Sequence, residues 1–318
     1  MKDKFIDKSK LKILVCCHKP CDLPEDELLL PVHVGASLSD ADFGMQRDDM
    51  LFGKPCDNIS AKNKTYCEIT AIYWAWKNIK KLYPDLEYIG LNHYRRFFAF
   101  EKSFFDIYAC PEPMKASDYC LDKTKLSSAL QHSRACVAKP KVYKYSLATD
   151  YCVHHVSDDY RKLKNIVYEL YPSYEDSFKE VMEQNNKLSH YNMFILRWDD
   201  FDAYCTWLFS ILTEVEKVVD VSSYTDVQKR VFGYMAERLL NVWLYHNKIK
   251  TKRIPVYWFV DRKMPSVWKY RATVRLNNLG FNKSMPLRVH LKFLLYKFKH
   301  GETIVQYLRR FKREEIEI

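Results

Sequence analysis

The chain has little glycine and no long apolar run. Its 318 residues include seven glycines, and no two of them lie closer than nine residues apart. This spacing excludes a glycine-rich dinucleotide turn and a P-loop, because both need clustered glycines that let backbone N–H groups approach a phosphate. The longest uncharged runs, 28–39 and 203–213, hold about a dozen residues, whereas a membrane-spanning helix needs about 20. We therefore expect no membrane-spanning segment.

Cysteine is plentiful, but the spacing typical of a structural metal site is missing. None of the ten cysteines forms a C-x-x-C pair, and the amino-terminal segment MKDKFIDKSKLK is charged, without an apolar signal core. We therefore expect a cytoplasmic protein with reduced thiols. Cys16, Cys17, His18 and Cys21 are a weak zinc candidate, because adjacent residues of a strand point to opposite faces.

Positive charge is abundant and concentrated near the carboxyl terminus. The chain has 51 Lys and Arg against 40 Asp and Glu, a net charge of +11, and residues 248–318 hold 18 of the basic and only 5 of the acidic residues. Within that segment, Leu287, Leu291, Leu294, Leu295 and Phe298 alternate with Arg288, Lys292, Lys297 and Lys299. This basic amphipathic pattern is typical of a helix that binds an anionic membrane surface, although a solvated basic helix would show it too.

Alternating strand and helix patterns predict an α/β fold with a mostly parallel sheet. We expect strands at 12–18, 28–34, 87–92 and 190–196, and helices beginning at Thr65 and covering 158–170, 201–215 and 225–245. Residues 101–150 are irregular and tyrosine-rich, which suits an insertion that covers a substrate. We divide the chain into a catalytic domain at 1–256, with a nucleotide-sugar half at about 1–100 and an acceptor side at about 101–256, and a basic, mainly helical extension at 257–318.

Polar side chains follow two of the predicted strands. His18 and Lys19 come after the first, and the run Asn92-His93-Tyr94-Arg95-Arg96 ends the third. Because ligands of such sheets bind beyond the carboxyl ends of the strands, these groups should lie together at one mouth. Adjacent arginines offer permanently charged donors suited to phosphate, although a pair of surface arginines is the plainer reading.

The predicted helix at 225–245 carries a narrow polar face. Arg230, Gly233, Glu237 and Asn241 are spaced three and four residues apart, so they share one side. Glycine inside a helix costs about 1 kcal/mol relative to alanine, which indicates that something approaches closely at Gly233. A carboxylate on a mostly apolar helix can have its pKa raised, so Glu237 is a candidate general base. The alternative is a solvated face.

Two further clusters give weaker signals. Asp40 and Asp42 form an acidic D-x-D pair that could chelate a divalent cation between diphosphate oxygens. His154 and Asp158 are one helical turn apart, but helix capping by Ser157 or Asp158 explains that segment more simply.

Several long motifs in order resemble one family. They are Leu14–Pro20, Pro31–Ala36, Asp57–Asn63, Tyr66–Asn78, Tyr88–Phe97, His190–Ile195 and Arg230–Trp243. Over residues 11–256 the chain resembles the bacterial capsular and exopolysaccharide biosynthesis glycosyltransferases that were catalogued as a domain of unknown function. The resemblance implies a GT-A-like fold with a single Rossmann-type nucleotide-binding domain. It also implies transfer of a hexosyl group from a UDP-sugar, UDP-galactofuranose among them, to a lipid-linked polysaccharide acceptor.

Carried onto this chain, the resemblance implies a role for each matching residue. It assigns the donor nucleotide to His18, Lys19, Asp57, Asn58, Ser60, Lys62, Asn63 and Arg230, the acceptor to His190 and Asn192, and catalysis to Glu237, His93, Arg95 and Arg96. Many GT-A enzymes carry a metal-binding D-x-D where this chain has His93-Tyr94-Arg95-Arg96. We therefore expect metal-independent catalysis in which arginine neutralises the leaving diphosphate. The alternative is Mn²⁺ or Mg²⁺ dependence, with Asp40 and Asp42 as the first ligands to consider.

Two other functional classes compete with this interpretation. A non-catalytic protein that binds a membrane surface or polysaccharide would explain the basic segment and the aromatic residues, but not the ordered polar motifs. A nucleic-acid-binding protein would explain the basic segment alone, and no recognition motif accompanies it. We expect a glycosyltransferase attached peripherally to the inner face of the plasma membrane, with no nucleic-acid partner.

Overall fold

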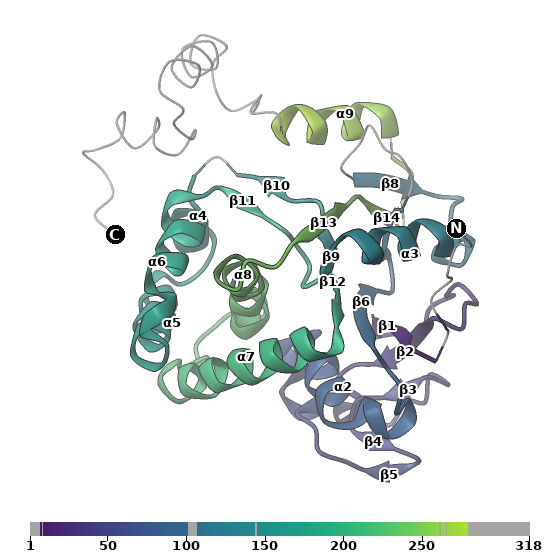
Figure 1. The fold of residues 1–318 in the computed structure, drawn as a ribbon, viewed down its shortest axis with the longest axis horizontal. Coiled ribbons are helices and arrows are strands. Elements are labelled where there is room, and N and C mark those ends of the chain that lie inside the picture. The colour runs from purple at the N-terminus through teal and green to yellow at the C-terminus, as the bar shows by residue number, and fades with distance from the viewer. Residues whose placement is uncertain are drawn as a thin grey trace.

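A mixed, mostly parallel β-sheet forms the centre of the fold, with helices packed on it (Figure 1). The computed structural model describes residues 7, 9–100, 107–143, 145–260, 262–264 and 266–278. The main sheet contains β1 (Leu11–Cys17), β2 (Leu29–His33), β3 (Gln46–Arg47), β6 (Tyr88–His93), β7 (Arg96–Phe98), β8 (Ile107–Pro111), β9 (Ala135–Ala138), β12 (Phe194–Arg197), β13 (Thr251–Ile254) and β14 (Val256–Val260). Two small antiparallel pairs lie outside it: β4 (Met50–Leu51) with β5 (Lys54–Pro55), and β10 (Lys141–Val142) with β11 (Lys187–Leu188).

The strand order is β13-β9-β12-β6-β1-β2-β3, and β7, β14 and β8 continue from β6. β1 runs parallel to both β2 and β6, whereas β12 lies antiparallel between β6 and β9. Every residue of β1 is buried, as expected of a central strand covered on both faces. The expected α/β class with a mostly parallel sheet is confirmed.

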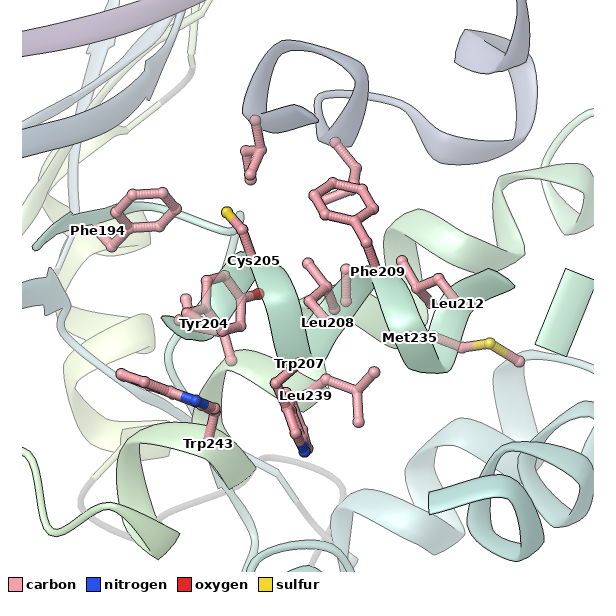
Figure 2. Close-up of a cluster of buried hydrophobic side chains, with 14 of the residues drawn as sticks. Phe194, Tyr204, Cys205, Trp207, Leu208, Phe209, Leu212, Met235, Leu239 and Trp243 are labelled. Atoms are coloured by element: carbon pink, nitrogen blue, oxygen red, sulfur yellow. The ribbon is translucent and has the colours of Figure 1, made fainter. Parts of the chain in front are cut away.

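Helices pack on both faces of the sheet. The helices are α1 (Asn63–Tyr66), α2 (Ile69–Leu82), α3 (Lys123–His132), α4 (Leu147–His154), α5 (Ser157–Leu170), α6 (Glu175–Phe178), α7 (Trp198–Val218), α8 (Val231–His246) and α9 (Val267–Asn278), with a π-helical turn at Lys179–Gln184. One core lies between the sheet and α2, α7 and α8. Figure 2 shows Tyr204, Leu208 and Phe209 of α7 beside Met235, Leu239 and Trp243 of α8. The other core packs Phe97 and Phe98 of β7 with α3 and β14.

β6 has a glycine, Gly90, at its contact with β12, where there is no room for a side chain. A Cβ on Gly90 would stand 2.8 Å from Ile195 Cγ1 and 3.0 Å from the Phe194 carbonyl oxygen. A larger side chain there would push β12 away from the sheet. This contact fixes the antiparallel strand whose preceding turn forms one wall of the cleft described below.

Three expectations about local structure are wrong. The helix expected from Thr65 is interrupted at Cys67, whose φ is +54°, so Thr65 lies inside α1 and α2 begins at Ile69. The strand expected at 190–196 begins at Phe194, because residues 191 and 192 adopt left-handed conformations. The segment 101–150 is not a mere covering insertion, since β9 pairs inside the main sheet with β12 and β13.

Nothing in the described part of the chain is both long enough and apolar enough to span a bilayer as a helix. The amphipathic pattern at 287–299 lies outside the described residues. β14 begins at Val256 and joins the sheet, and the domain division at 256 stays a prediction.

Candidate functional site

A cleft of about 1070 Å³ opens where β1 and β6 end. His18 follows β1 and His93 ends β6, while Arg230, the residue before α8, and Glu237 within α8 also line the cleft. Seven lysine or arginine side chains and four carboxylates line the cleft. The carboxyl ends of parallel strands therefore present a mainly basic cavity, as expected for a site that binds an anion.

Arg95 and Arg96 both line this cleft because β6 has already ended when the chain reaches them. The chain turns at Tyr94 and Arg95, and Arg96 begins β7 by pairing with His93. The Nε atoms of both arginines are buried without a hydrogen-bond partner. The Arg96 guanidinium lies 4.5 Å from the centre of the Tyr191 ring, and the described residues supply neither arginine with an ion-paired carboxylate. Their unmatched charge suits a phosphate.

Arg230 is held in the same cleft by an unusual contact with Cys67. Its Nε donates to the Cys67 Sγ at 3.2 Å. A Cβ on Gly233 would lie 3.2 Å from both the Cβ and the Sγ of Cys67. The close approach expected at Gly233 is therefore made by Cys67, a neighbour within the fold.

Replacing Cys67 should separate backbone strain from the thiol contact. Its φ of +54° with ψ of −133° is a conformation that favours glycine. Because such strain costs about 1–3 kcal/mol, we expect Cys67→Gly to be more stable than Cys67→Ala in urea unfolding. Gly233→Ala should destabilise the wild type, yet gain helix stability in the Cys67→Gly background. Equal stability of the two Cys67 variants would contradict this account.

The turn at residues 190–192 is fixed by side chains from three other segments. Tyr191 and Asn192 have φ values of +72° and +50°. The Tyr191 N–H donates to Glu237 Oε1, and His93 Nε2 lies 2.7 Å from the Tyr191 carbonyl oxygen, which it can only donate to. Asn192 Nδ2 donates to Glu68 Oε1 at 2.7 Å. These contacts outweigh the strand propensity of the segment.

The expectation of a raised pKa for Glu237 is wrong. Burial by itself would raise the pKa, but His190, Arg238 and the Tyr191 N–H together lower it to about 2. The His190 Nδ1 atom lies 3.4 Å from Glu237 Oε1, and the Arg238 Nη1 atom lies 3.9 Å from Oε2. Glu237 is therefore a stable carboxylate near neutral pH, and a poor base by itself.

Three histidines of the cleft, His18, His93 and His155, contribute little positive charge near neutral pH. Burial, with Lys19 and Arg95 nearby, lowers the pKa of His18. Burial also lowers the pKa of His93, and burial together with Arg238 lowers the pKa of His155 to about 4. The permanent charge of the cleft therefore comes from its arginines and lysines.

The structure brings together most of the predicted site residues. Those that line the cleft are His18, His93, Arg95, Arg96, Asn63, His190, Arg230 and Glu237. Lys19 instead lines an adjoining hollow of about 790 Å³, which shares Tyr94 and Arg95 with the cleft. Asn192 is buried with 1% exposure and positions the 190–192 turn, so an acceptor contact is not available to it.

Four residues expected in the donor pocket do not line the cleft. Asp57 accepts a hydrogen bond from the Tyr73 hydroxyl, and Lys62 forms an ion pair with Glu216 at 2.7 Å. The Asn58 side chain donates to the Cys56 carbonyl oxygen and accepts from the Ser60 N–H. Ser60 is fully buried and donates to Asp48 Oδ1 at 2.5 Å. These four side chains therefore stabilise the loop before α1. Asn63, the next predicted donor residue along the sequence, does line the cleft.

The candidate metal ligands are scattered. Asp40 and Asp42 are exposed, and Asp42 accepts from the Gly44 N–H at 2.8 Å. His154 pairs with Asp150 at 3.3 Å and not with Asp158. Across the ranges that the structure describes, no three or more His, Cys, Asp and Glu side chains are grouped so that they could hold a metal ion. The residues at the end of β6 do not fit a D-x-D metal site.

Several residues of the cleft have no role in the sequence-based prediction. Glu68 precedes α2 and binds Asn192, Tyr143 contacts His190, and Arg238 pairs with Asp150 at 3.3 Å. Glu68 lies inside the motif Tyr66–Asn78, so the family resemblance could have pointed to it as a site residue. Tyr143 lies outside every motif, so the sequence offers no signal for it.

Comparisons with known proteins agree with this geometry. The family described as Domain of unknown function (DUF4422) matches residues 12–248. The solved apo structure of the WbbM bifunctional glycosyltransferase is similar to this chain, with a TM-score of 0.68 and 26% sequence identity over 81% of this chain. The chain spans about half the length of that protein, 48%. No curated protein sequence matches significantly. The sheet and its helices thus form a GT-A-like glycosyltransferase fold.

Proposed function

Since the chain belongs to the DUF4422 family, we propose that it is a glycosyltransferase that uses a nucleotide-activated sugar. The observation that carries the proposal is the placement of Arg95, Arg96 and Arg230 in one cleft at the ends of β1 and β6, in a fold similar to that of the WbbM glycosyltransferase. Guanidinium groups that have no ion-paired carboxylate among the described residues suit the diphosphate of a nucleotide-sugar. Their positive charge would stabilise the negative charge that develops as the diphosphate leaves.

The finer assignment is a UDP-sugar donor, with UDP-galactofuranose as one member of the class to test. In this assignment His18 and Asn63 would contact the nucleotide, and His190 and Glu237 would contact the acceptor, since all four line the cleft. The acceptor is a growing, lipid-linked capsular or exopolysaccharide chain. The enzyme would meet it as a peripheral protein at the inner face of the plasma membrane, through the basic extension.

UDP binding tests the proposal directly. A ligand at a hundred times its Kd that binds only the folded protein stabilises it by about 2.7 kcal/mol. We expect UDP to raise the melting temperature, and one member of a UDP-sugar panel to release UDP in the presence of the purified protein. A protein that only binds membranes or polysaccharide would show neither effect.

Catalysis should not need a divalent metal. Because permanently charged arginines occupy the place of the D-x-D carboxylates, we expect UDP release to continue at its full rate in excess EDTA. Loss of turnover in EDTA, with recovery on adding Mn²⁺ or Mg²⁺, would contradict this prediction and return attention to Asp40 and Asp42.

A further inference from the structure

Three polar side chains from distant parts of the sequence form a continuous series of polar contacts in the wall of the cleft. Tyr143 follows β10, His190 begins the 190–192 turn, and Glu237 belongs to α8. The Tyr143 Oη atom lies 2.6 Å from His190 Nε2, and His190 Nδ1 lies 3.4 Å from Glu237 Oε1. The Tyr143 and His190 rings also pack together, with their centres 5.4 Å apart.

The Glu237 carboxylate sets the direction in which protons are donated among these three side chains. Glu237 is ionised near neutral pH, since its pKa is about 2, so it accepts a hydrogen from His190 Nδ1. His190 Nε2 is then the free acceptor, and the Tyr143 hydroxyl donates to it. A carboxylate bonded to Nδ1–H holds an imidazole in one tautomer and stabilises the imidazolium that forms when Nε2 takes a proton.

Glu237 is poorly placed to take a proton from a substrate itself. Its Oε1 accepts from the Tyr191 N–H and faces His190, while its Oε2 faces Arg238. The Glu237 and His190 side chains are each 14% exposed. Oε1 is therefore occupied by the protein and Oε2 faces a permanent cation that keeps the carboxylate ionised, which leaves the cleft-lining Tyr143 as the end of the relay that can meet a substrate.

The charged groups around His190 come from α4 and α8. Glu237 favours the imidazolium, and Asp150 of α4 interacts with His190 in the same sense. Arg238 opposes it but is itself paired with Asp150 at 3.3 Å. Burial, with the charge of Glu237, raises the pKa of Tyr143, so the phenol stays protonated and available to donate.

We propose that Tyr143, His190 and Glu237 form a proton relay that deprotonates the acceptor hydroxyl, with Tyr143 as the catalytic residue that contacts it. This proposal rests on the proposed function. The acceptor oxygen bonds to the anomeric carbon, and the bond from that carbon to the diphosphate oxygen breaks, leaving its electron pair on the nucleoside diphosphate. The acceptor proton passes to the Tyr143 oxygen as the Tyr143 proton passes to His190 Nε2. The imidazolium, paired with Glu237, releases the proton to water after the product leaves.

Kinetics with a UDP-sugar that supports turnover test the relay. A general base contributes about 10²–10⁴-fold, so Tyr143→Phe should lower kcat at least a hundredfold, while UDP still raises the melting temperature as in the wild type. Tyr171→Phe is the matched control, because it also removes one phenol hydrogen bond, the 2.7 Å contact with Ser210, away from the cleft. A Tyr143→Phe kcat within tenfold of the wild type would overturn the relay.

The pH profile separates this chemistry from a structural role. The relay needs a free acceptor nitrogen, so kcat should fall at low pH, and this acid limb should vanish in His190→Gln. Glu237 Oε1 lies 3.4 Å from His190 Nδ1, so removing its charge in Glu237→Gln should move the acid limb to lower pH. An unmoved limb in Glu237→Gln would contradict the relay.

A second measurement does not depend on turnover. ¹⁵N NMR of the imidazoles, with His190→Gln to assign the resonance, should show His190 protonated at Nδ1 and unprotonated at Nε2. The opposite tautomer would overturn the relay even if the enzyme is active. If no UDP-sugar is turned over and UDP does not bind, the proposed function fails instead, whatever tautomer is observed.

Discussion

Replacing either Arg95 or Arg96 by glutamine is expected to lower kcat/KM for the nucleotide-sugar by about 10²–10³-fold, because one preorganised donor to developing charge is worth about 3–4 kcal/mol. Glutamine keeps a polar side chain but removes the positive charge. Neither guanidinium has an ion-paired carboxylate in the described residues, and both Nε atoms are buried without a partner. Their charge is therefore available to the diphosphate.

The lysine variants of the same residues are informative. Lysine keeps the charge but loses the planar fork that binds two phosphate oxygens, so Arg95→Lys and Arg96→Lys should recover only part of the activity. Arg134→Gln is a suitable control, because Arg134 pairs with Asp200 and is absent from the cleft. Turnover within fivefold of the wild type in both glutamine variants would remove the arginines from the mechanism.

Arg238→Met is expected to destabilise the fold by about 3–5 kcal/mol, the usual cost of removing one partner of a buried ion pair. Arg238 is 3% exposed. It donates to Asp150 Oδ2 at 3.3 Å and to the Tyr234 carbonyl oxygen at 3.1 Å, and its Nη1 lies 3.9 Å from Glu237. Methionine fills the space but leaves two buried carboxylates without this cation. Urea unfolding at neutral pH measures the loss.

The pH dependence of the Arg238→Met variant should identify Asp150 as the cause. Burial raises the pKa of Asp150 in the folded protein, and Arg238 opposes that effect. Without Arg238 the folded-state pKa rises further above the unfolded value, so the native state binds more protons and the variant becomes more stable as the pH falls toward that pKa. Arg161→Met, which removes an exposed pair with Asp158, should change stability little. A loss below about 1 kcal/mol in Arg238→Met would contradict a buried-pair role.

Much of the sheet could be predicted because its strands are short apolar runs. β1 and β6 are found within one or two residues of their expected bounds, since burial on both faces leaves a continuous apolar signal. The position of Arg95 and Arg96 at the cleft follows from the same signal. β1 and β6 are parallel, so their carboxyl ends lie at the same edge of the sheet. β9 was not expected, because its apolar run is only four residues long and two of those residues are alanines, which have a low strand propensity.

The amino-acid sequence by itself determined the α/β class, the strand ends that meet at the cleft, and the helical face shared by Glu237 of α8 and Arg230, the residue before it. Only the tertiary structure decided what those groups can do. The low pKa of Glu237, the left-handed turn at Tyr191 and the contact between Cys67 and Gly233 all depend on residues that are far apart in the chain. A pKa and a strained backbone conformation are set by charges and donors within a few ångströms in space, and local sequence patterns do not reveal which distant segments supply them.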